Sequence, residues 1–223
     1  MDYWIVELLK AAVLIPVTLL PIINPVANAS IFIGMTGDNE ALAARMAKQI
    51  AINCWFLLLA ALLVGAYVLD FFGISLPIVR VAGGLVVAVN GWRMLNDRGH
   101  DAIRARVAEG ASDLSDEEVA QRSFFPISFP LTVGPGTLAA AIAIGTKAAP
   151  SAVAYLSSIV SAIIGATLSA AVIYATYLFA APLLRRLGQL GMIVLLRLAA
   201  FILLCVGIEI MWSGIAELLS RGS

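Results

Sequence analysis

Two short stretches of the sequence interrupt apolar segments with the residue types that begin a helix. PIINPVANAS (21–30) contains Asn24-Pro25, and PLTVGPGTLA (130–139) contains Gly134-Pro135. Asparagine is favoured at the position that caps a helix N-terminus, and proline is favoured at the first helical position. We expect each pair to start a short helix whose free N–H groups carry a partial positive charge. Two such ends facing a shared central cavity would bind a small anionic group such as a carboxylate.

The residues around the two pairs predict the rest of the ligand. No acidic residue lies near the predicted centre to balance a net cation. An ammonium group would instead bind the carbonyls that each break frees, or the side-chain oxygens of Asn24 and Asn28. The neighbouring residues are small, and they are Ala27, Ala29, Ser30, Gly136 and Ala139. These features favour a small zwitterion.

Three interpretations of residues 21–30 compete. The first is a signal-peptidase site, which Ala27-Asn28-Ala29 imitates, but the related stretch at 130–139 cannot be cleaved in this way. The second is a simple proline kink. The third is a functional break, because residues 4–35 as one straight helix would measure about 48 Å at 1.5 Å per residue. That length exceeds the roughly 30 Å of a hydrocarbon core, which favours a broken helix.

The composition predicts a multi-span membrane protein. The chain has 223 residues, of which 61% are hydrophobic and 13% are charged, whereas soluble domains carry about 25% charged residues. A formal net charge of zero gives no electrostatic support for nucleic-acid binding. Six apolar segments are long enough to cross a bilayer, and they are Trp4–Thr36, Gln49–Asp70, Ile74–Leu95, Arg122–Thr146, Ser151–Pro182 and Leu190–Leu218.

The spans divide into two similar halves, residues 1–95 and 122–223, separated by a polar stretch at 96–121. Besides the two breaks, RVAGGLVVAV beginning at Arg80 resembles RLAAFILLCV beginning at Arg197. A unit of three spans leaves the chain on the opposite side of the membrane, so a second copy must be inverted. The sequence therefore predicts an all-α membrane protein with six transmembrane helices in a 3+3 inverted-topology repeat, with helices 1 and 4 broken. Many secondary transporters have this architecture.

Positive charges in the short connections predict the orientation. One side holds nine of them, and they are Arg45, Lys48, Arg93, Arg98, Arg104, Arg106, Arg122, Arg185 and Arg186, whereas the other holds only Lys10, Lys147 and Arg221. The richer side is predicted to be cytoplasmic, which places both termini in the periplasm. The stretch 96–121 is predicted to be a solvated cytoplasmic linker, with a regulatory or partner-binding loop as the alternative. Its end, Ser115–Glu118, has the pattern of a capping box that starts the next helix.

Three ionisable residues lie within the predicted spans, where such residues are costly and are treated as functional hypotheses. They are Arg80, Arg197 and Glu209. Both arginines could instead extend to the lipid headgroups. Glu209 lies about 18 Å beyond Arg197 along a helix, at a depth similar to that of Arg80. An Arg80–Glu209 pair with a gating or coupling role is therefore predicted.

The sequence gives little support for metal or catalytic chemistry. Cys54 and Cys205 lie in apolar segments and His100 lies in the polar linker, which predicts reduced, buried thiols rather than a metal site. The spans contain no Ser–His, His–Glu or HExxH arrangement, so no enzyme activity and no cofactor are expected. The absence of GxxxxGK[ST] excludes a self-contained ATP-driven pump.

The motifs resemble those of the MarC family of multi-pass bacterial inner-membrane proteins. The matching stretches are LLPIINPVANASIFIGMT, LPIVRVAGGLVV and FPLTVGPGTLAAAIAIG, and with the six-span layout they cover nearly the whole chain. The family is similar to small neutral amino acid transporters and, more distantly, to LysE-type exporters. The resemblance implies movement of alanine- or glycine-like substrates coupled to an ion such as a proton or sodium. The family pattern has glycine at the position of Ala27, which leaves less room here for close backbone approach.

The resemblance also implies a set of substrate-binding residues. They are Asn24, Pro25, Asn28, Thr132, Gly134, Pro135, Gly136 and Thr137. The competing interpretation is a non-transporting membrane scaffold or partner-binding component. Measurement of substrate flux separates the two. Transport direction, the coupling ion and homo-oligomer formation stay open.

Overall fold

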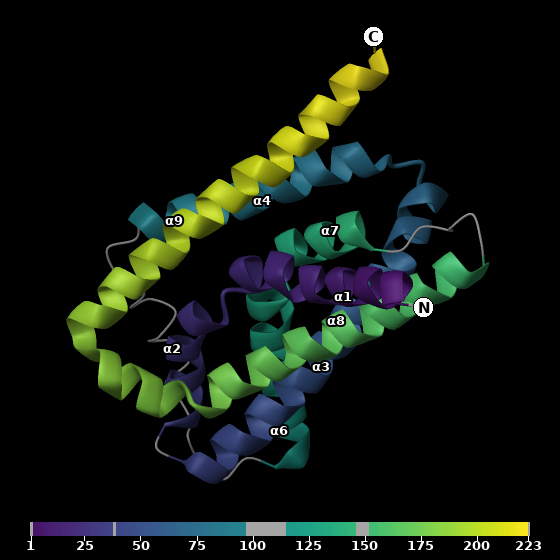
Figure 1. Ribbon diagram of the computed structural model, residues 1–223. Coiled ribbons are helices and arrows are strands. Elements are labelled where there is room, and N and C mark those ends of the chain that lie inside the picture. Colours follow the sequence, from purple (N-terminus) through teal and green to yellow (C-terminus); the bar gives the residue numbers. More distant parts are fainter. Residues whose placement is uncertain (1, 38, 97–114, 146–151, 223) are drawn as a thin grey trace.

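The computed structural model describes residues 2–37, 39–96, 115–145 and 152–222, and these residues form helices without any strand (Figure 1). The first half contains α1 (Asp2–Ile23), α2 (Pro25–Thr36), α3 (Glu40–Phe71) and α4 (Leu76–Asn96). The second half contains α6 (Asp116–Arg122), η1 (Ser123–Thr132), α7 (Pro135–Ile144), α8 (Ala152–Leu178) and α9 (Ala180–Gly222). The predicted all-helical class is confirmed.

Four helical stretches are long and apolar enough to cross a membrane, and they are Glu40–Phe71, Leu76–Asn96, Tyr155–Leu178 and Leu190–Ser220. Two further pairs qualify only together. Ala12–Ile23 and Pro25–Thr36 meet at a bend of 49°, and Asp116–Thr132 and Pro135–Ile144 meet at a bend of 65°. The described chain therefore has four candidate spans, or six if each bent pair crosses once. Each of the six predicted segments overlaps one of these stretches.

Helices α4 and α9 run antiparallel, with their backbones in contact. Gly84 lies against Gly207 and Met211, and Gly91 lies against Leu204. A Cβ atom at Gly84 would be 2.4 Å from the Met211 backbone nitrogen, closer than real atoms approach. Figure 1 shows α9 lying along α4 in this way. Glycine is needed here because only a missing side chain lets two helices approach so closely.

The core lies around α3, which contacts α7, α8 and η1. Its fully buried face carries Ile50, Leu58 and Leu62. Large apolar side chains cover the outside, and Phe56, Phe71 and Leu190 are 61%, 85% and 81% exposed. Such a surface suits contact with lipid and not with water.

Two helices contain interruptions beyond the predicted breaks. Phe125 and Phe129 have extended backbone conformations inside η1, with φ of −119° and −132°. Gly188 has a φ of 62° and bends α9 near its start, and glycine suits this left-handed conformation because it has no Cβ. The long apolar part of α9 begins directly after this bend, at Leu190.

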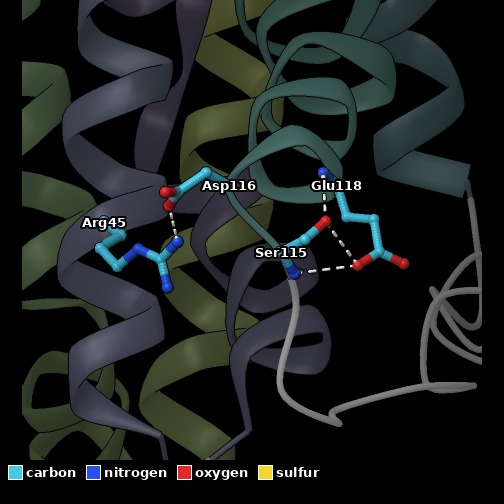
Figure 2. A network of polar contacts seen from close by, with 4 residues as sticks. All are labelled: Arg45, Ser115, Asp116 and Glu118. Carbon is cyan, nitrogen blue, oxygen red and sulfur yellow. Dashed lines mark hydrogen bonds and ion pairs between the residues drawn. The ribbon is translucent and has the colours of Figure 1, made fainter.

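The start of α6 is fixed by side chains (Figure 2). The Ser115 hydroxyl accepts a hydrogen bond from the Glu118 backbone N–H at 3.3 Å, and a Glu118 carboxylate oxygen accepts one from the Ser115 backbone N–H at 2.9 Å. The predicted capping box is therefore confirmed. Asp116 also pairs with Arg45, which ties α6 to α3. The rest of the predicted linker, residues 97–114 with His100, lies outside the described residues.

Candidate functional site

The first break lies between α1 and α2, at Asn24. Its backbone has left-handed torsion angles (φ 45°, ψ 58°), which asparagine adopts more readily than most residues. Its side-chain oxygen accepts a hydrogen bond from the Ala27 N–H at 3.4 Å, and Pro25 is the first residue of α2. The predicted roles of Asn24 and Pro25 at a helix start are confirmed. The side chain is buried, and its Nδ2 has no hydrogen-bond partner among the described residues.

The second break lies between η1 and α7. Gly134 has an extended conformation (φ −87°, ψ −178°) and Pro135 is the first residue of α7, so this predicted helix start is confirmed too. A Cβ atom at Gly134 would lie 2.4 Å from the Pro130 carbonyl oxygen. The first turn of α7 has no side-chain cap, so its N–H groups keep their partial positive charge.

Asn28 connects the two breaks. Its Nδ2 donates hydrogen bonds to the Ile23 carbonyl at 3.2 Å and to the Leu131 carbonyl at 3.1 Å. Ile23 is the last residue of α1, and Leu131 comes just before the end of η1. One side chain therefore satisfies carbonyls at both interruptions, although they are more than one hundred residues apart in the chain.

Buried hydroxyl groups extend this contact. Thr132 Oγ1 and the Tyr177 hydroxyl are hydrogen-bonded at 2.8 Å, and both residues are fully buried. The Ser128 hydroxyl donates to the Ser123 carbonyl at 2.6 Å and accepts from Asn53 of α3 at 3.3 Å. We call Asn24, Asn28, Ser128, Thr132 and Tyr177 the polar cluster.

The polar cluster suits a small, uncharged or zwitterionic ligand. All its side chains are neutral, and within the described residues no three His, Cys, Asp or Glu side chains are grouped to hold a metal ion. It offers amide and hydroxyl donors beside two helix N-termini, which attract negative charge. Its carbonyl and amide oxygens are acceptors for an ammonium group.

The structure brings some of the predicted binding residues together. Asn24, Asn28 and Thr132 lie around the contact of the two breaks, and Gly134 and Pro135 follow Thr132 directly. The other two residues lie in the first turn of α7. Thr137 is buried there, and Gly136 faces α4, where a Cβ atom would be 2.5 Å from a Val87 methyl group. Close packing is thus sufficient to explain the glycine at position 136.

The predicted Arg80–Glu209 pair is wrong. Arg80 forms its ion pair with Glu217, at 2.6 Å. The prediction failed because of the orientation of α9. Gly207 and Gly214 lie on the face of α9 that contacts α4. Residues turn by about 100° per position in a helix, so Glu209 points away from α4. Depth in the membrane alone does not decide which side chains meet.

The remaining charged residues within spans are also separate from the polar cluster. Arg197 and Glu209 are both exposed on α9. Neither has a hydrogen bond or ion pair within the part of the chain that the structure describes. Their predicted gating or coupling role stays a prediction.

Charge exchange between α4 and α9 tests the observed pair. Arg80→Glu is expected to lower the melting temperature, and the double variant Arg80→Glu/Glu217→Arg is expected to restore it. Both side chains are partly exposed (28% and 31%), so we expect a coupling energy of about 0.5–1 kcal/mol in a double-mutant cycle. The matched control is Arg80→Glu/Glu209→Arg, which is expected to restore nothing. If only Arg80→Glu/Glu209→Arg restored the melting temperature, the result would support the pair of Arg80 with Glu209.

Tyr177, Phe32 and Ser128 were not predicted from the sequence as parts of the site. Phe32 and Tyr177 stack with ring centroids 4.9 Å apart at an interplanar angle of 24°. The available signals were a tyrosine near the end of an apolar span and the spacing of Phe32 four residues after Asn28. Neither signal identifies a partner on another helix.

Comparison with known proteins gives one consistent result. Residues 9–219 match the family described as MarC family integral membrane protein. The chain is 33% identical over 216 residues to the inner membrane protein MarC of Escherichia coli K12. The aligned region covers 96% of this chain and 97% of that protein. The MarC protein of Shigella flexneri is similar to the same extent. No solved structure matches the chain.

Proposed function

Since the chain belongs to the MarC family of integral membrane proteins, we propose that it is a secondary transporter of the bacterial inner membrane. Its proposed substrate is a small neutral amino acid such as alanine or glycine, moved with a proton or sodium ion. The observation that carries this proposal is the double hydrogen bond of Asn28, which joins two helix breaks at one partly buried place. Irregular backbone at membrane depth is tolerated where it is buried in protein or lines a cavity.

The chemistry of the polar cluster supports a zwitterionic substrate. A carboxylate would accept hydrogen bonds from the N-terminal N–H groups of α2 and α7, and from Asn24 Nδ2, which has no partner among the described residues. An ammonium group would donate to amide and carbonyl oxygens nearby. Ala27, Ala29 and Ala140 are buried around the two starts, and this close packing favours a small substrate.

Helix contacts support a 3+3 inverted repeat, which we propose as the architecture. Under this repeat α3 corresponds to α8 and α4 corresponds to α9, and both of these pairs are in contact. In the same way α1 corresponds to η1 and α2 corresponds to α7. The contact of α2 with α9 in one half then has its counterpart in the contact of α7 with α4, and the contact of α1 with α8 has its counterpart in the contact of η1 with α3. All four contacts occur. The antiparallel arrangement of α4 and α9 agrees with a two-fold axis in the membrane plane.

Orientation and coupling complete the proposal. Arg45, Lys48 and Arg93 lie in the segments that we assign to the cytoplasmic side by the positive-inside rule, so both termini are periplasmic. Each bent pair then crosses the membrane once. Arg80, Arg197 and Glu209 stay the proposed gating or coupling residues, with Arg80 acting through its pair with Glu217.

Uptake by proteoliposomes tests the transport proposal. Labelled alanine or glycine is expected to accumulate when a proton or sodium gradient is imposed, and not in protein-free liposomes. Asn24→Ala is expected to lower the uptake rate about tenfold, since a hydrogen bond to a charged group contributes about 1.5–3 kcal/mol. Its stability should fall by about 1–2 kcal/mol, because the variant loses an N-cap and places alanine in a left-handed conformation that asparagine tolerates better.

Ser115→Ala is the matched control, because it removes the N-cap of α6 outside the polar cluster. It should lower stability by about 1 kcal/mol through the lost cap and leave uptake unchanged. An absence of flux under every gradient, with folded protein, would reject the transporter and favour the scaffold alternative. Equal uptake by Asn24→Ala and wild type would show that the first break is only a structural kink without a role in transport.

A further inference from the structure

A pocket of about 640 Å³ lies where α2 ends, α3 begins and α8 ends. Its lining includes Thr36, Asn39 and Glu40 near the α2–α3 connection, and Phe179 and Pro182 near the α8–α9 connection. These connections are on the side that we propose to be cytoplasmic. The pocket therefore provides an aqueous approach to the protein interior from that side.

Phe32 and Tyr177 also line the pocket, although each is only 1% exposed. Side chains that contact a pocket while remaining buried form its inner wall. The two rings are stacked, with centroids 4.9 Å apart. They come from different helices, α2 and α8, so a relative movement of these helices would separate them.

The polar cluster lies directly behind this wall. The Tyr177 hydroxyl is bonded to Thr132, which ends η1 just before the second break. Along α2, Asn28, Phe32 and Thr36 follow at intervals of four residues, and Asn24 caps the start of the helix. Residues at this spacing share one helix face, and the face extends about 12 Å from Asn28 to Thr36 at 1.5 Å per residue.

We propose that Phe32 and Tyr177 are the closed gate between this pocket and the polar cluster, and that the Tyr177–Thr132 hydrogen bond holds the gate shut. The proposal rests on the transport function proposed above, because it assigns the route to that same binding site. The stacked rings keep water out of the polar cluster, where low polarity strengthens hydrogen bonds to a bound zwitterion. Passage of substrate requires the ring of Tyr177 to move away from both Phe32 and Thr132.

Cys54 is a native reporter for this gate. Its thiol is fully buried on α3 and lies close to Ser128 of the polar cluster, so we place it on the inner side of the ring pair. The other cysteine, Cys205, is exposed, so the prediction of a buried thiol was wrong for this residue. Cys205 is replaced by serine in every protein tested. Labelling of Cys54 by a charged, water-soluble methanethiosulfonate is then measured over time by intact-protein mass spectrometry on the full chain in detergent.

We expect Cys54 to react about tenfold faster in Phe32→Ala and Tyr177→Ala than in the parent protein, because thiol reaction rates depend on access. Tyr177→Phe and Thr132→Val keep the ring pair and remove only the hydrogen bond, and they are expected to raise the rate by a smaller factor. The matched control is Phe179→Ala, which removes an exposed aromatic ring from the same pocket and should leave the rate unchanged.

If an alanine variant fails to fold, Tyr177→Phe and Thr132→Val still test the gate. Parent-level labelling in every folded variant of Phe32, Tyr177 and Thr132 would overturn the gate, as would equal acceleration by Phe179→Ala. The labelling needs no transport substrate. Faster labelling without any amino acid flux would therefore reject the proposed function and keep the gate, whereas flux with unchanged labelling would reject only the gate.

Discussion

Replacement of Gly207 by alanine is expected to lower the free energy of unfolding by about 1–3 kcal/mol, the usual cost of overpacking a well-packed interior. A Cβ atom at this position would lie 2.3 Å from the Ala88 backbone nitrogen and 2.8 Å from the Gly84 carbonyl oxygen. Both are backbone atoms of α4, so no side-chain rotation relieves the clash and the two helices must separate. The measurement is thermal or denaturant unfolding of the purified protein in detergent.

Gly34→Ala is the control for this experiment. It adds the same methyl group to α2, where no atom lies within 4 Å of the new Cβ. Alanine is the better helix former by about 1 kcal/mol, so this variant should be as stable as wild type or more stable. Similar unfolding of the two variants would contradict the backbone contact of α4 and α9.

Replacement of Asn28 by leucine is expected to reduce both stability and transport. The variant loses the donor for the Ile23 and Leu131 carbonyls. A buried polar group left without its partner costs about 1–3 kcal/mol, so we expect a total loss of about 2 kcal/mol or more. Uptake should fall further than this instability explains, because the two breaks lose their only described side-chain link.

Asn90→Leu is the matched control, since it makes the same substitution in a candidate span. Asn90 is exposed on α4 and has no hydrogen bond within the described part of the chain. Leucine there should have little effect on unfolding or uptake. If Asn28→Leu behaved in the same way, Asn28 would not join the breaks in the functional protein.

Local signals in the sequence predicted the helix starts correctly. Asn24, Gly134 and Ser115 all precede helices in the structure, because capping and the restricted φ of proline depend on neighbouring residues. The second predicted span shows that hydropathy does not give the start of a helix. Hydropathy placed its start at Gln49, whereas α3 begins at Glu40 after the Asn39 cap. A helix extends past the apolar part that crosses the bilayer.

Contacts between distant segments could not be predicted in this way. The Arg80–Glu209 pair was wrong because its derivation used depth and ignored the face and register of α9. Tyr177 was missed because its partners, Thr132 and Phe32, lie on other elements. By contrast, the extended conformations of Phe125 and Phe129 in η1 are local, because each residue precedes a proline and the residue before a proline is disfavoured from the helical region.

The contact between α4 and α9 has a mechanical consequence. Where glycines place two backbones against each other, as at Gly84 and Gly207, sliding or rotation of one helix would bring larger side chains into the contact, so we expect the pair to move as one rigid body. In alternating-access transport, one part of a protein rocks against another around a fixed site. Under the transport function proposed above, the moving boundary would therefore lie elsewhere, and the side-chain contacts of α2 with α8 offer such a boundary.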